Sequence, residues 1–351
     1  GNNFELIEKS YLCSAFVEYY IDTNEFDKCY EMIIRQHENV SASALIGMLR
    51  FSSQQSAAEE GYNLSTRKNL TQSMMKHLDT KSFIAELRKD GSRYAPYMEI
   101  NYTGHLIHTS KQNDRSLFFR MKKLLHESRD ILTKQEMYIF YSMTAAYGNK
   151  IFSGANETKH RDNVLELYKI MISENAYKFS PEDHLQIGLF RSMLISSRVA
   201  GDFKWMKELI DNYLKELHPK YADNMRSYAM GQYYFGTGEY GKALESLAVL
   251  KSDYFLYKKD LKNLQFRIYY SLGYIEEAYS VLESLKKYLA GTEELSSEMR
   301  KVTGNFVKYA GELLKARDKG SREEAEYVKA KILSDPETES ADWIIEKLDE
   351  I

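Results

Sequence analysis

The sequence predicts an all-α protein, a right-handed solenoid of about seven to eight antiparallel helix pairs closed by a C-terminal capping helix. A pattern recurs about every 36 residues in the second half, as in stacked helical hairpins: Met230–Leu244 returns in degraded form as Gln265–Tyr279. Glycines at 201, 238 and 273 mark the same point of successive copies. The 351 residues include only four prolines and 18 glycines, and strand-like alternation is scarce.

The N-terminal hairpin is expected over residues 4–36. Apolar side chains recur there at helical spacing, and Thr23-Asn24 breaks the run. Asn24 stands where later copies carry glycine. Because asparagine tolerates the left-handed conformation that often ends a helix, Asn24 is expected to adopt it.

The pattern is looser over residues 41–91, where no repeat phase is clear. Helices are expected over 42–56 and 66–88, interrupted at Gly61-Tyr62-Asn63. More regular pairs are expected after this segment, over 93–110 with 115–129 and 134–151 with 162–175.

A helix start is predicted at Ser180-Pro181, since serine can cap a helix and proline suits its first turn. Ser321 and Glu324 form a capping-box pattern for a later helix. The pairs expected in this half are 183–200 with 203–217, 221–235 with 240–251, 260–272 with 275–289, and 295–317 with 321–333.

Trp343, Ile344, Ile345 and Leu348 predict an amphipathic helix that seals the end of the array. The predicted organisation is a single solenoid over residues 1–351, divided into an N-terminal hairpin (1–40), an irregular helical segment (41–91), divergent helical repeats (92–179), regular repeats (180–334) and a capping helix (339–351).

Composition narrows the classes of function. A net charge of −3 argues against a dedicated nucleic-acid binder, which would carry a basic excess. No apolar run approaches the roughly 20 residues that span a bilayer. Cys13 and Cys29 are too few for a disulfide framework in a chain of this length. We therefore expect a cytoplasmic protein with reduced cysteines and no membrane association.

Residues 227–250 resemble the tetratricopeptide repeat. The match consists of a small residue, aromatics, a turn glycine, an alanine and apolar positions: Gly231, Tyr234, Gly238, Tyr240, Ala243, Leu247 and Leu250. The next copy matches at Gly273, Ala278, Leu282 and Leu285, and the last at Gly320 and Ala325. The resemblance implies stacked helical hairpins whose first helices line a concave groove.

From about Leu125 to its end, the chain also resembles an uncharacterised family of bacterial helical-repeat proteins of Bacteroidetes type. The resemblance is carried by Lys134–Tyr138, by the turn at Asp202–Trp205 and by Ala341–Leu348. That family carries no assigned activity, so the resemblance supports the fold and does not indicate a function.

Signatures of catalysis are missing from the sequence. It contains no glycine-rich phosphate loop, nucleophile-elbow serine or zinc-protease motif. His105 and His108 have the spacing of metal ligands on a helix, but two polar histidines near a helix end account for them better. Cys29 occupies a position where later copies carry alanine, which indicates packing. We expect no enzyme activity, no metal and no cofactor.

The predicted groove mixes arginines with aromatic and amide side chains. Guanidinium groups clamp carboxylates with two parallel hydrogen bonds, which suits an acidic or C-terminal peptide. The alternative is that these arginines only solvate a helix face. The candidate groove residues are Arg191, Arg198, Tyr228, Gln232, Phe235, Asn263, Arg267, Tyr270 and Arg317.

The sequence thus favours a non-enzymatic scaffold that binds a peptide or protein segment in a concave groove. The alternative function is a regulatory domain that senses a small ligand or a nucleic acid. Tyrosine pairs such as Tyr233-Tyr234 and Tyr269-Tyr270 are possible platforms for base stacking. They recur at the end of the first helix of each hairpin, so packing explains them better and nucleic acid is not the expected partner.

Overall fold

The computed structural model of the chain describes residues 3–62, 64, 67–110, 113–152, 161–250, 255–292, 295–335 and 337–351, except for the side chains of 60–62 and 255–257. Within these residues the regular secondary structure is helical, in seventeen α-helices and one short 3-10 helix. The β pairing found there is an isolated bridge between Leu185 and Leu217. The all-α prediction is confirmed for the described part of the chain.

The chain divides into two compact units. The first unit runs to Tyr147 and includes Met171–Ser180; the second comprises the described residues of Gly148–Ile170 and Pro181–Ile351. The first unit contains α1 (Asn3–Asp22), α2 (Phe26–Tyr62), α3 (Leu70–Met75), α4 (Thr80–Lys89), α5 (Ala95–Thr109), α6 (Arg115–Glu127), most of α7 (Lys134–Ile151) and the end of α8 (Arg161–Ser173).

The first hairpin is longer than the sequence predicted. Asn24 has φ of 57°, which confirms the expected left-handed turn between α1 and α2. However, α2 continues without a break to Tyr62, so the separate helix predicted over 42–56 is wrong. Residues 37–41, which separate the expected hairpin from the expected helix over 42–56, contain neither proline nor glycine. Nothing there interrupts the helical hydrogen bonds.

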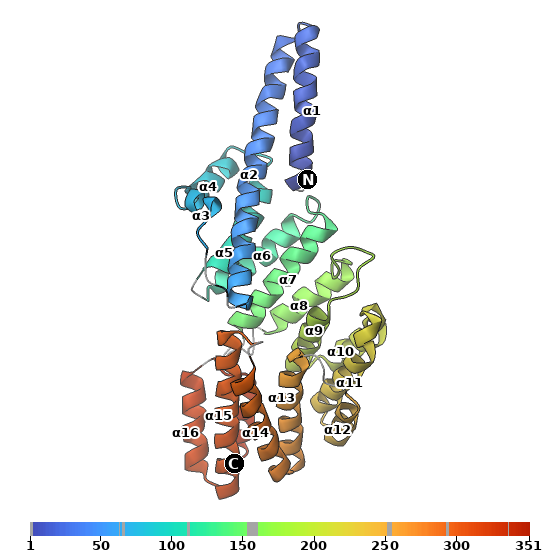
Figure 1. Ribbon diagram of the computed structural model, residues 1–351, viewed down its shortest axis with the longest axis vertical. Helices are drawn as coiled ribbons and strands as arrows, with labels where there is room; N and C mark the ends of the chain where they lie inside the picture. The colour runs from blue at the N-terminus through green and yellow to red at the C-terminus, as the bar shows by residue number, and fades with distance from the viewer. Residues whose placement is uncertain are drawn as a thin grey trace. The chain divides into compact units, whose positions relative to one another are not determined.

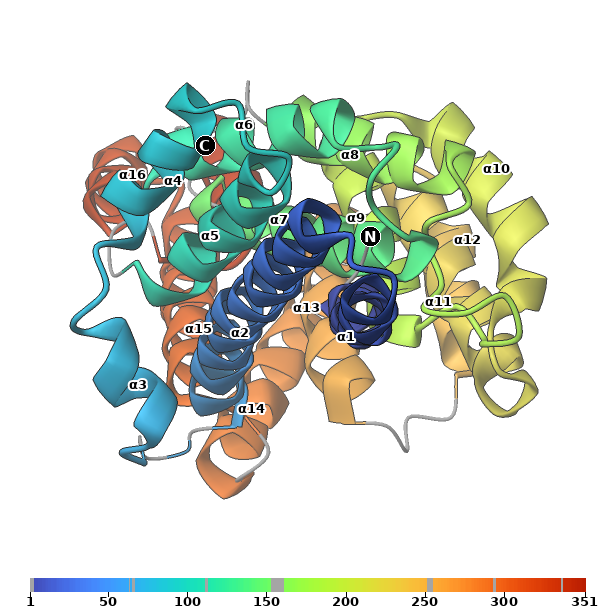
Figure 2. The same cartoon turned by 90° about the horizontal axis from the view of Figure 1, so that it is seen from above.

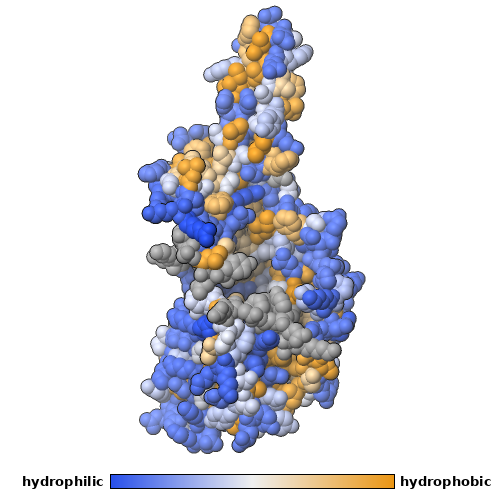
Figure 3. Space-filling model, in the orientation of Figure 1, coloured by the Kyte–Doolittle hydropathy of each residue, from blue (hydrophilic) through white to orange (hydrophobic). Residues whose placement is uncertain are grey.

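The α1–α2 hairpin exposes much apolar surface. In α1 the buried residues are Leu6 and Ser10. Large apolar side chains are exposed along both helices, and Figure 3 shows such side chains in orange on this hairpin, which Figure 1 draws in blue. They include Phe4, Tyr11, Leu12, Tyr19, Phe26 and Tyr30.

The helix predicted over 66–88 is two short helices, α3 and α4, and residue 66 lies outside the described residues. Asp79 lies between them and caps α4, because its Oδ1 accepts a hydrogen bond from the Ser82 backbone N–H at 3.1 Å. An aspartate at this position starts a new helix by satisfying an otherwise unpaired amide. The single-helix prediction overlooked this start signal.

The second unit contains the helices for which the sequence predicted regular repeats. Its helices are the start of α8, α9 (Ile187–Val199), α10 (Phe203–Tyr213), the 3-10 helix η2 (Leu214–Glu216), α11 (Pro219–Gly236), α12 (Tyr240–Ala248), α13 (Phe255–Leu272), α14 (Ile275–Gly291), α15 (Ser297–Lys319), α16 (Arg322–Ser334) and α17 (Ala341–Asp349). Here α9–α10, α11–α12, α13–α14 and α15–α16 pack as sequence-adjacent pairs. Figure 2 shows α10, α14 and α16 outside α9, α13 and α15 in this unit.

Sequence explains why the pairs turn and pack alike. Gly238 and Gly273 end the first helices of two pairs with φ of 81° and 79°, which a side chain would disfavour. Gly231 allows α11 to approach α12, since a Cβ there would lie 2.6 Å from Leu247 Cδ2. Ala243 and Ala278 are buried in their pairs, as expected for packing positions.

The helix predicted to start at Ser180-Pro181 is wrong at its N-terminus, because α9 begins only at Ile187. The preceding backbone is held in another way: the Leu185 N–H donates to the Glu216 carbonyl at 2.9 Å. Leu185 is buried, so this contact outweighs the local start signal. By contrast, the cap at Ser321 is confirmed, since its Oγ accepts from the Glu324 N–H at 3.3 Å.

The closing helix α17 packs against α15 and α16, with Ile344 and Leu348 buried. Trp343 reaches further along the unit and lies edge-on to Phe266 and Tyr270 of α13, at centroid distances of 6.0 and 5.4 Å. The C-terminal helix therefore contacts the first helices of two pairs, α13 and α15, as well as α16.

Candidate functional site

The nine residues predicted to line a groove lie on α9, α11, α13 and α15, the first helices of four successive pairs. We call the surface that these four helices share the first-helix face. Six of the nine side chains are buried: Tyr228, Gln232, Phe235, Asn263, Arg267 and Tyr270. Arg191 and Arg198 are half-buried, and Arg317 is exposed. The predicted set is therefore mostly covered by the chain's own side chains, and its role in binding stays a prediction.

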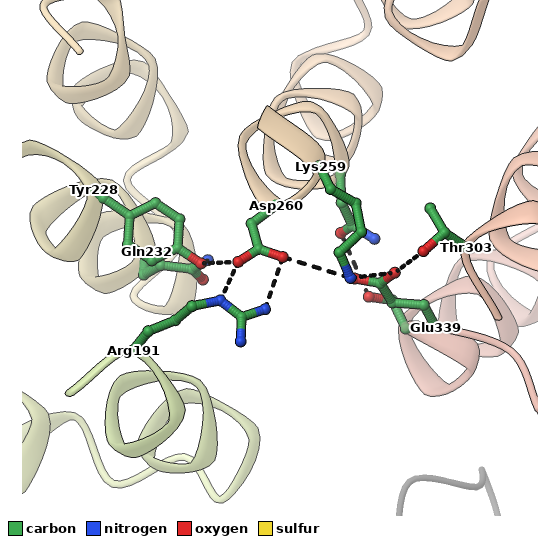
Figure 4. Close-up of polar contacts among 9 residues, drawn as sticks. Arg191, Tyr228, Gln232, Lys259, Asp260, Thr303 and Glu339 are labelled. Atoms are coloured by element: carbon green, nitrogen blue, oxygen red, sulfur yellow. Dashed lines mark hydrogen bonds and ion pairs between the residues drawn. The ribbon is translucent and has the colours of Figure 1, made fainter. Parts of the chain in front are cut away.

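Asp260 of α13 connects three elements of this face (Figure 4). Arg191 of α9 donates to both oxygens of the Asp260 carboxylate, from Nε to Oδ2 and from Nη2 to Oδ1, the latter at 2.7 Å. Tyr228 of α11 donates from its hydroxyl to Oδ2 at 3.5 Å. Asp260 is only 5% exposed, so this carboxylate depends on its partners for stabilisation.

A second ion pair joins α13 to the residues before α17. Lys259 Nζ lies 3.1 Å from Glu339 Oε2 and 3.6 Å from Asp260 Oδ1. Thr303 of α15 donates from Oγ1 to Glu339 Oε2 at 3.0 Å. Arg191, Asp260, Lys259 and Glu339 thus form a continuous series of charges, drawn in Figure 4, that reaches from α9 to the residues before α17.

The pKa values of Asp260 and Lys259 are shifted in the directions expected when opposite charges stabilise one another. Burial alone would raise the pKa of the Asp260 carboxyl, but the charges of Arg191 and Lys259 hold it below 3.8. Burial would lower the pKa of Lys259, yet Glu339 and Asp260 raise it above its ordinary value. Asp260 and Lys259 are therefore both ionised at neutral pH.

Arg198 of α9 and Arg267 of α13 have no such carboxylate partner among the described residues. Both guanidinium groups face the Phe235 ring, with Cζ at 5.8 and 4.6 Å from its centroid. Each Nε is buried and makes no hydrogen bond within the described part of the chain. Neither side chain pairs with a carboxylate of any described residue, although Arg267 is only 3% exposed.

Arg267 carries a charge that its surroundings disfavour. Burial, and next the positive charge of Arg198, lower its pKa well below the usual value. A guanidinium is not deprotonated in proteins, so the side chain keeps its charge in an unfavourable environment.

A third arginine, Arg161 at the start of α8, is paired with Asp342 of α17.

The charges on this face do not balance. Five cations lie together here, and three of them have acidic partners: Arg161 with Asp342, Arg191 with Asp260 and Lys259 with Glu339. Among the described residues, Arg198 and Arg267 remain without an acidic partner, which leaves an excess of two positive charges on this face. An isolated buried charge is expensive, so natural proteins usually pair it.

Amide side chains next to these arginines are also only partly satisfied. The Asn263 Nδ2 and Gln232 Oε1 atoms are buried without a hydrogen-bond partner among the described residues. Gln232 donates from Nε2 to the Tyr228 hydroxyl at 2.9 Å, and Asn263 Oδ1 accepts from the Ser340 hydroxyl at 3.4 Å. The face therefore offers further unused hydrogen-bonding capacity beside Arg267.

Arg317 and Tyr270 form a separate contact. The Arg317 Nη1 donates to the Tyr270 carbonyl at 2.8 Å, and its Cζ lies 4.4 Å from the centroid of the Tyr270 ring. Tyr270 in turn packs against Trp343. Arg317 thus satisfies a carbonyl near the end of α13, and its guanidinium is already engaged.

Sequence reasoning missed the acidic members of this cluster. Asp260 and Glu339 pair with residues 69 and 80 positions away, a relation that no local pattern reveals. For Asp260 one signal was available: a carboxylate on the first helix of a pair, beside the projected arginines, is a natural partner for them.

Other candidate sites gain no support. The part of the chain that the structure describes contains no group of three or more metal-ligating side chains. Cys29 is buried and Cys13 half-buried, and both are free thiols. Among the described helices, none is both long enough and apolar enough to cross a bilayer.

Comparisons with known proteins identify no relative: no protein-family model matches the chain, and neither a curated protein nor a solved structure matches it significantly.

Proposed function

We propose that this protein is a non-enzymatic interaction scaffold, a solenoid resembling tetratricopeptide-repeat arrays, whose first-helix face receives a peptide or protein segment. Support comes from the sequence-adjacent helix pairs, the left-handed glycines between them and the small residue Gly231 at a helix contact. Stacked pairs of this kind present one helix of each pair on a common surface.

The observation that carries the proposal is that this face already holds one segment, residues 337–351 of the same chain, which we call the C-terminal segment. Its backbone is bound as a ligand's would be: Asn305 donates from Nδ2 to the Glu337 carbonyl at 2.9 Å, and the Glu339 N–H donates to the Val302 carbonyl at 3.4 Å. An acidic side chain, Glu339, meets Lys259, and an aromatic one, Trp343, meets Phe266.

These contacts define the kind of partner that the face accepts. It combines a cation, hydroxyl and amide donors and an aromatic surface, which suits a segment with an acidic residue followed by a large aromatic residue. Charge alone is insufficient, since an exposed ion pair contributes roughly 0.2–1 kcal/mol whereas micromolar binding needs about 8 kcal/mol. Burial of an aromatic side chain supplies most of the remainder.

Affinity capture from cell lysate tests the proposal, with the parent chain, Lys259→Glu and the control Arg322→Glu. Lys259 lies on the first-helix face, whereas Arg322 is exposed at the start of α16. We expect a protein that the parent and Arg322→Glu retain and Lys259→Glu loses, confirmed by titrating its purified segment. Equal capture by all three chains would reject this face as the binding surface.

The alternative, a regulatory domain that senses a small ligand, is favoured by one observation. Arg198 and Arg267 carry buried positive charge without an acidic partner in the described chain, and a small anionic ligand would supply one. Small-molecule sites typically combine apolar walls with a few well-placed polar groups, and the Phe235 ring provides such a wall.

A further inference from the structure

We propose that Arg198 and Arg267 form a binding site for an oxyanion, the carboxylate or phosphate group of a ligand. The two side chains come from α9 and α13, and their guanidinium groups share contact with the Phe235 ring of α11. The proposal is independent of the scaffold function, since it concerns the chemistry of one position on the first-helix face.

The energetics of burial support such a site. Removing a charge from water costs several kcal/mol, and a paired countercharge normally offsets this cost. Arg191, a residue of the same face, follows the rule through its two hydrogen bonds to Asp260. Arg198 and Arg267 have no such countercharge among the described residues, and a bound anion would supply one.

The donor set matches an oxyanion. A guanidinium presents several N–H groups in a plane, which fits the two oxygens of a carboxylate or the oxygens of a phosphate. The Nε atoms of Arg198 and Arg267 have no acceptor in the described chain, and neither has Nδ2 of Asn263. Asn263 and Arg267 are four positions apart on α13, so they lie on the same side of that helix.

The surroundings hold these donors in place. The Phe235 ring contacts both guanidinium groups, and Trp343 lies 6.0 Å from the Arg267 Cζ on the side of α17. The nearby acid Asp342 pairs with Arg161 through Oδ2, and its Oδ1 is buried without a hydrogen-bond partner among the described residues. Aromatic contact fixes the orientation of the arginines without neutralising them, which leaves their charge for a ligand.

The test is a calorimetric titration of the full chain with inorganic phosphate and, separately, with succinate, at constant ionic strength. The parent is expected to bind at least one probe saturably. Arg267→Met and Arg198→Met should weaken that binding by about tenfold or more, because hydrogen bonds to charged groups contribute at least this factor. Arg322→Gln, the control, should bind like the parent.

The two probes separate the possible sources of the anion: preference for phosphate indicates a phosphorylated ligand, and preference for succinate a carboxylate. No saturable binding of either probe by the parent, or equal binding by all the variants, would overturn the proposal. Circular dichroism checks that each variant is folded. If Arg267→Met does not fold, Arg267→Lys replaces it and should bind more weakly than the parent; unchanged affinity in both Arg267→Lys and Arg198→Met overturns the site.

The capture experiment tests the scaffold function and the titration tests the oxyanion site, so either proposal can be rejected while the other is retained. Loss of the captured partner in Lys259→Glu with no anion binding would retain the scaffold and remove the oxyanion site. Anion binding that depends on Arg267, without any partner retained by the face, would retain the site and remove the scaffold.

Discussion

Arg191 binds Asp260 through two hydrogen bonds that join α9 to α13, across 69 positions of sequence. Seven residues after Asp260 on the same helix, Arg267 is buried like Asp260 but has no carboxylate partner in the described chain. Two arginines of one face thus occupy opposite electrostatic situations, and this contrast leads to predictions of opposite sign.

Replacing Arg191 by methionine should destabilise the second unit by about 3 kcal/mol, since a buried carboxylate left without its partner keeps its desolvation cost. Lys259, at 3.6 Å from Asp260, compensates only in part. Urea unfolding measures the change. The double variant Arg191→Met/Asp260→Leu should recover most of the loss, and a single variant as stable as the parent would contradict the account.

Replacing Arg267 by methionine should raise the free energy of unfolding, in buffer without added oxyanion, by about 1 kcal/mol. The reason is the removal of a buried charge that has no acidic partner among the described residues, set against the lost contact with Phe235. The same urea experiment decides the sign. Destabilisation comparable to that of Arg191→Met would show that Arg267 is satisfied in the free protein.

Two glycine-to-alanine substitutions should differ in sign. Gly304 in α15 has open space where a Cβ would stand, so Gly304→Ala should stabilise the protein by about 1 kcal/mol through helix propensity. At Gly231 the new Cβ would lie 2.6 Å from Leu247 Cδ2 and 3.0 Å from its Cγ. Gly231→Ala should therefore destabilise by about 1–3 kcal/mol, as overpacked sites do. Thermal unfolding of both variants provides the comparison.

Acid should destabilise the first unit through Glu136. Burial would raise the pKa of this carboxyl, but hydrogen bonds from Tyr97 and Arg50 lower it below 4.5. A carboxyl with a depressed folded-state pKa stabilises the protein above its unfolded pKa and loses this contribution as pH falls through the folded value. The stability of the parent should therefore decline as pH falls below about 4.5.

Glu136→Gln is the control for this pH dependence. It should be less stable than the parent at neutral pH and should lose less stability on acidification. Urea unfolding of both proteins across the acidic range provides the measurement. Parallel curves for parent and variant would show that Glu136 does not contribute to the acid sensitivity.

The sequence predicted the regular half of the fold well because its signals are local. Two turns require glycine because the backbone has a positive φ there, at Gly238 and Gly273. At Gly231 the helices approach too closely for a side chain. The start of α9 was predicted wrongly because a distant contact, from Leu185 to Glu216, overrides the signal at Ser180-Pro181.

The candidate site was only partly predictable. Helical register placed Arg191, Arg198 and Arg267 on first helices, and the structure has them on α9 and α13. Register could not show which arginine pairs with a carboxylate, because the positions of Asp260 and Glu339 relative to their partners depend on tertiary packing. Nor could it show that the C-terminal segment covers the face, because an amphipathic pattern does not identify the surface against which a helix packs.

The most direct test of the scaffold function is the binding of the C-terminal segment in trans. A fluorescent peptide of residues 337–351 is titrated with the parent chain and with Trp343→Ala, which loosens the chain's own segment by removing its contacts with Phe266 and Tyr270. We predict saturable binding of the peptide to Trp343→Ala and weaker binding to the parent, because the parent's own C-terminal segment competes for the face. Binding of a scrambled peptide equal to that of the native one, or no binding to Trp343→Ala, would contradict the account.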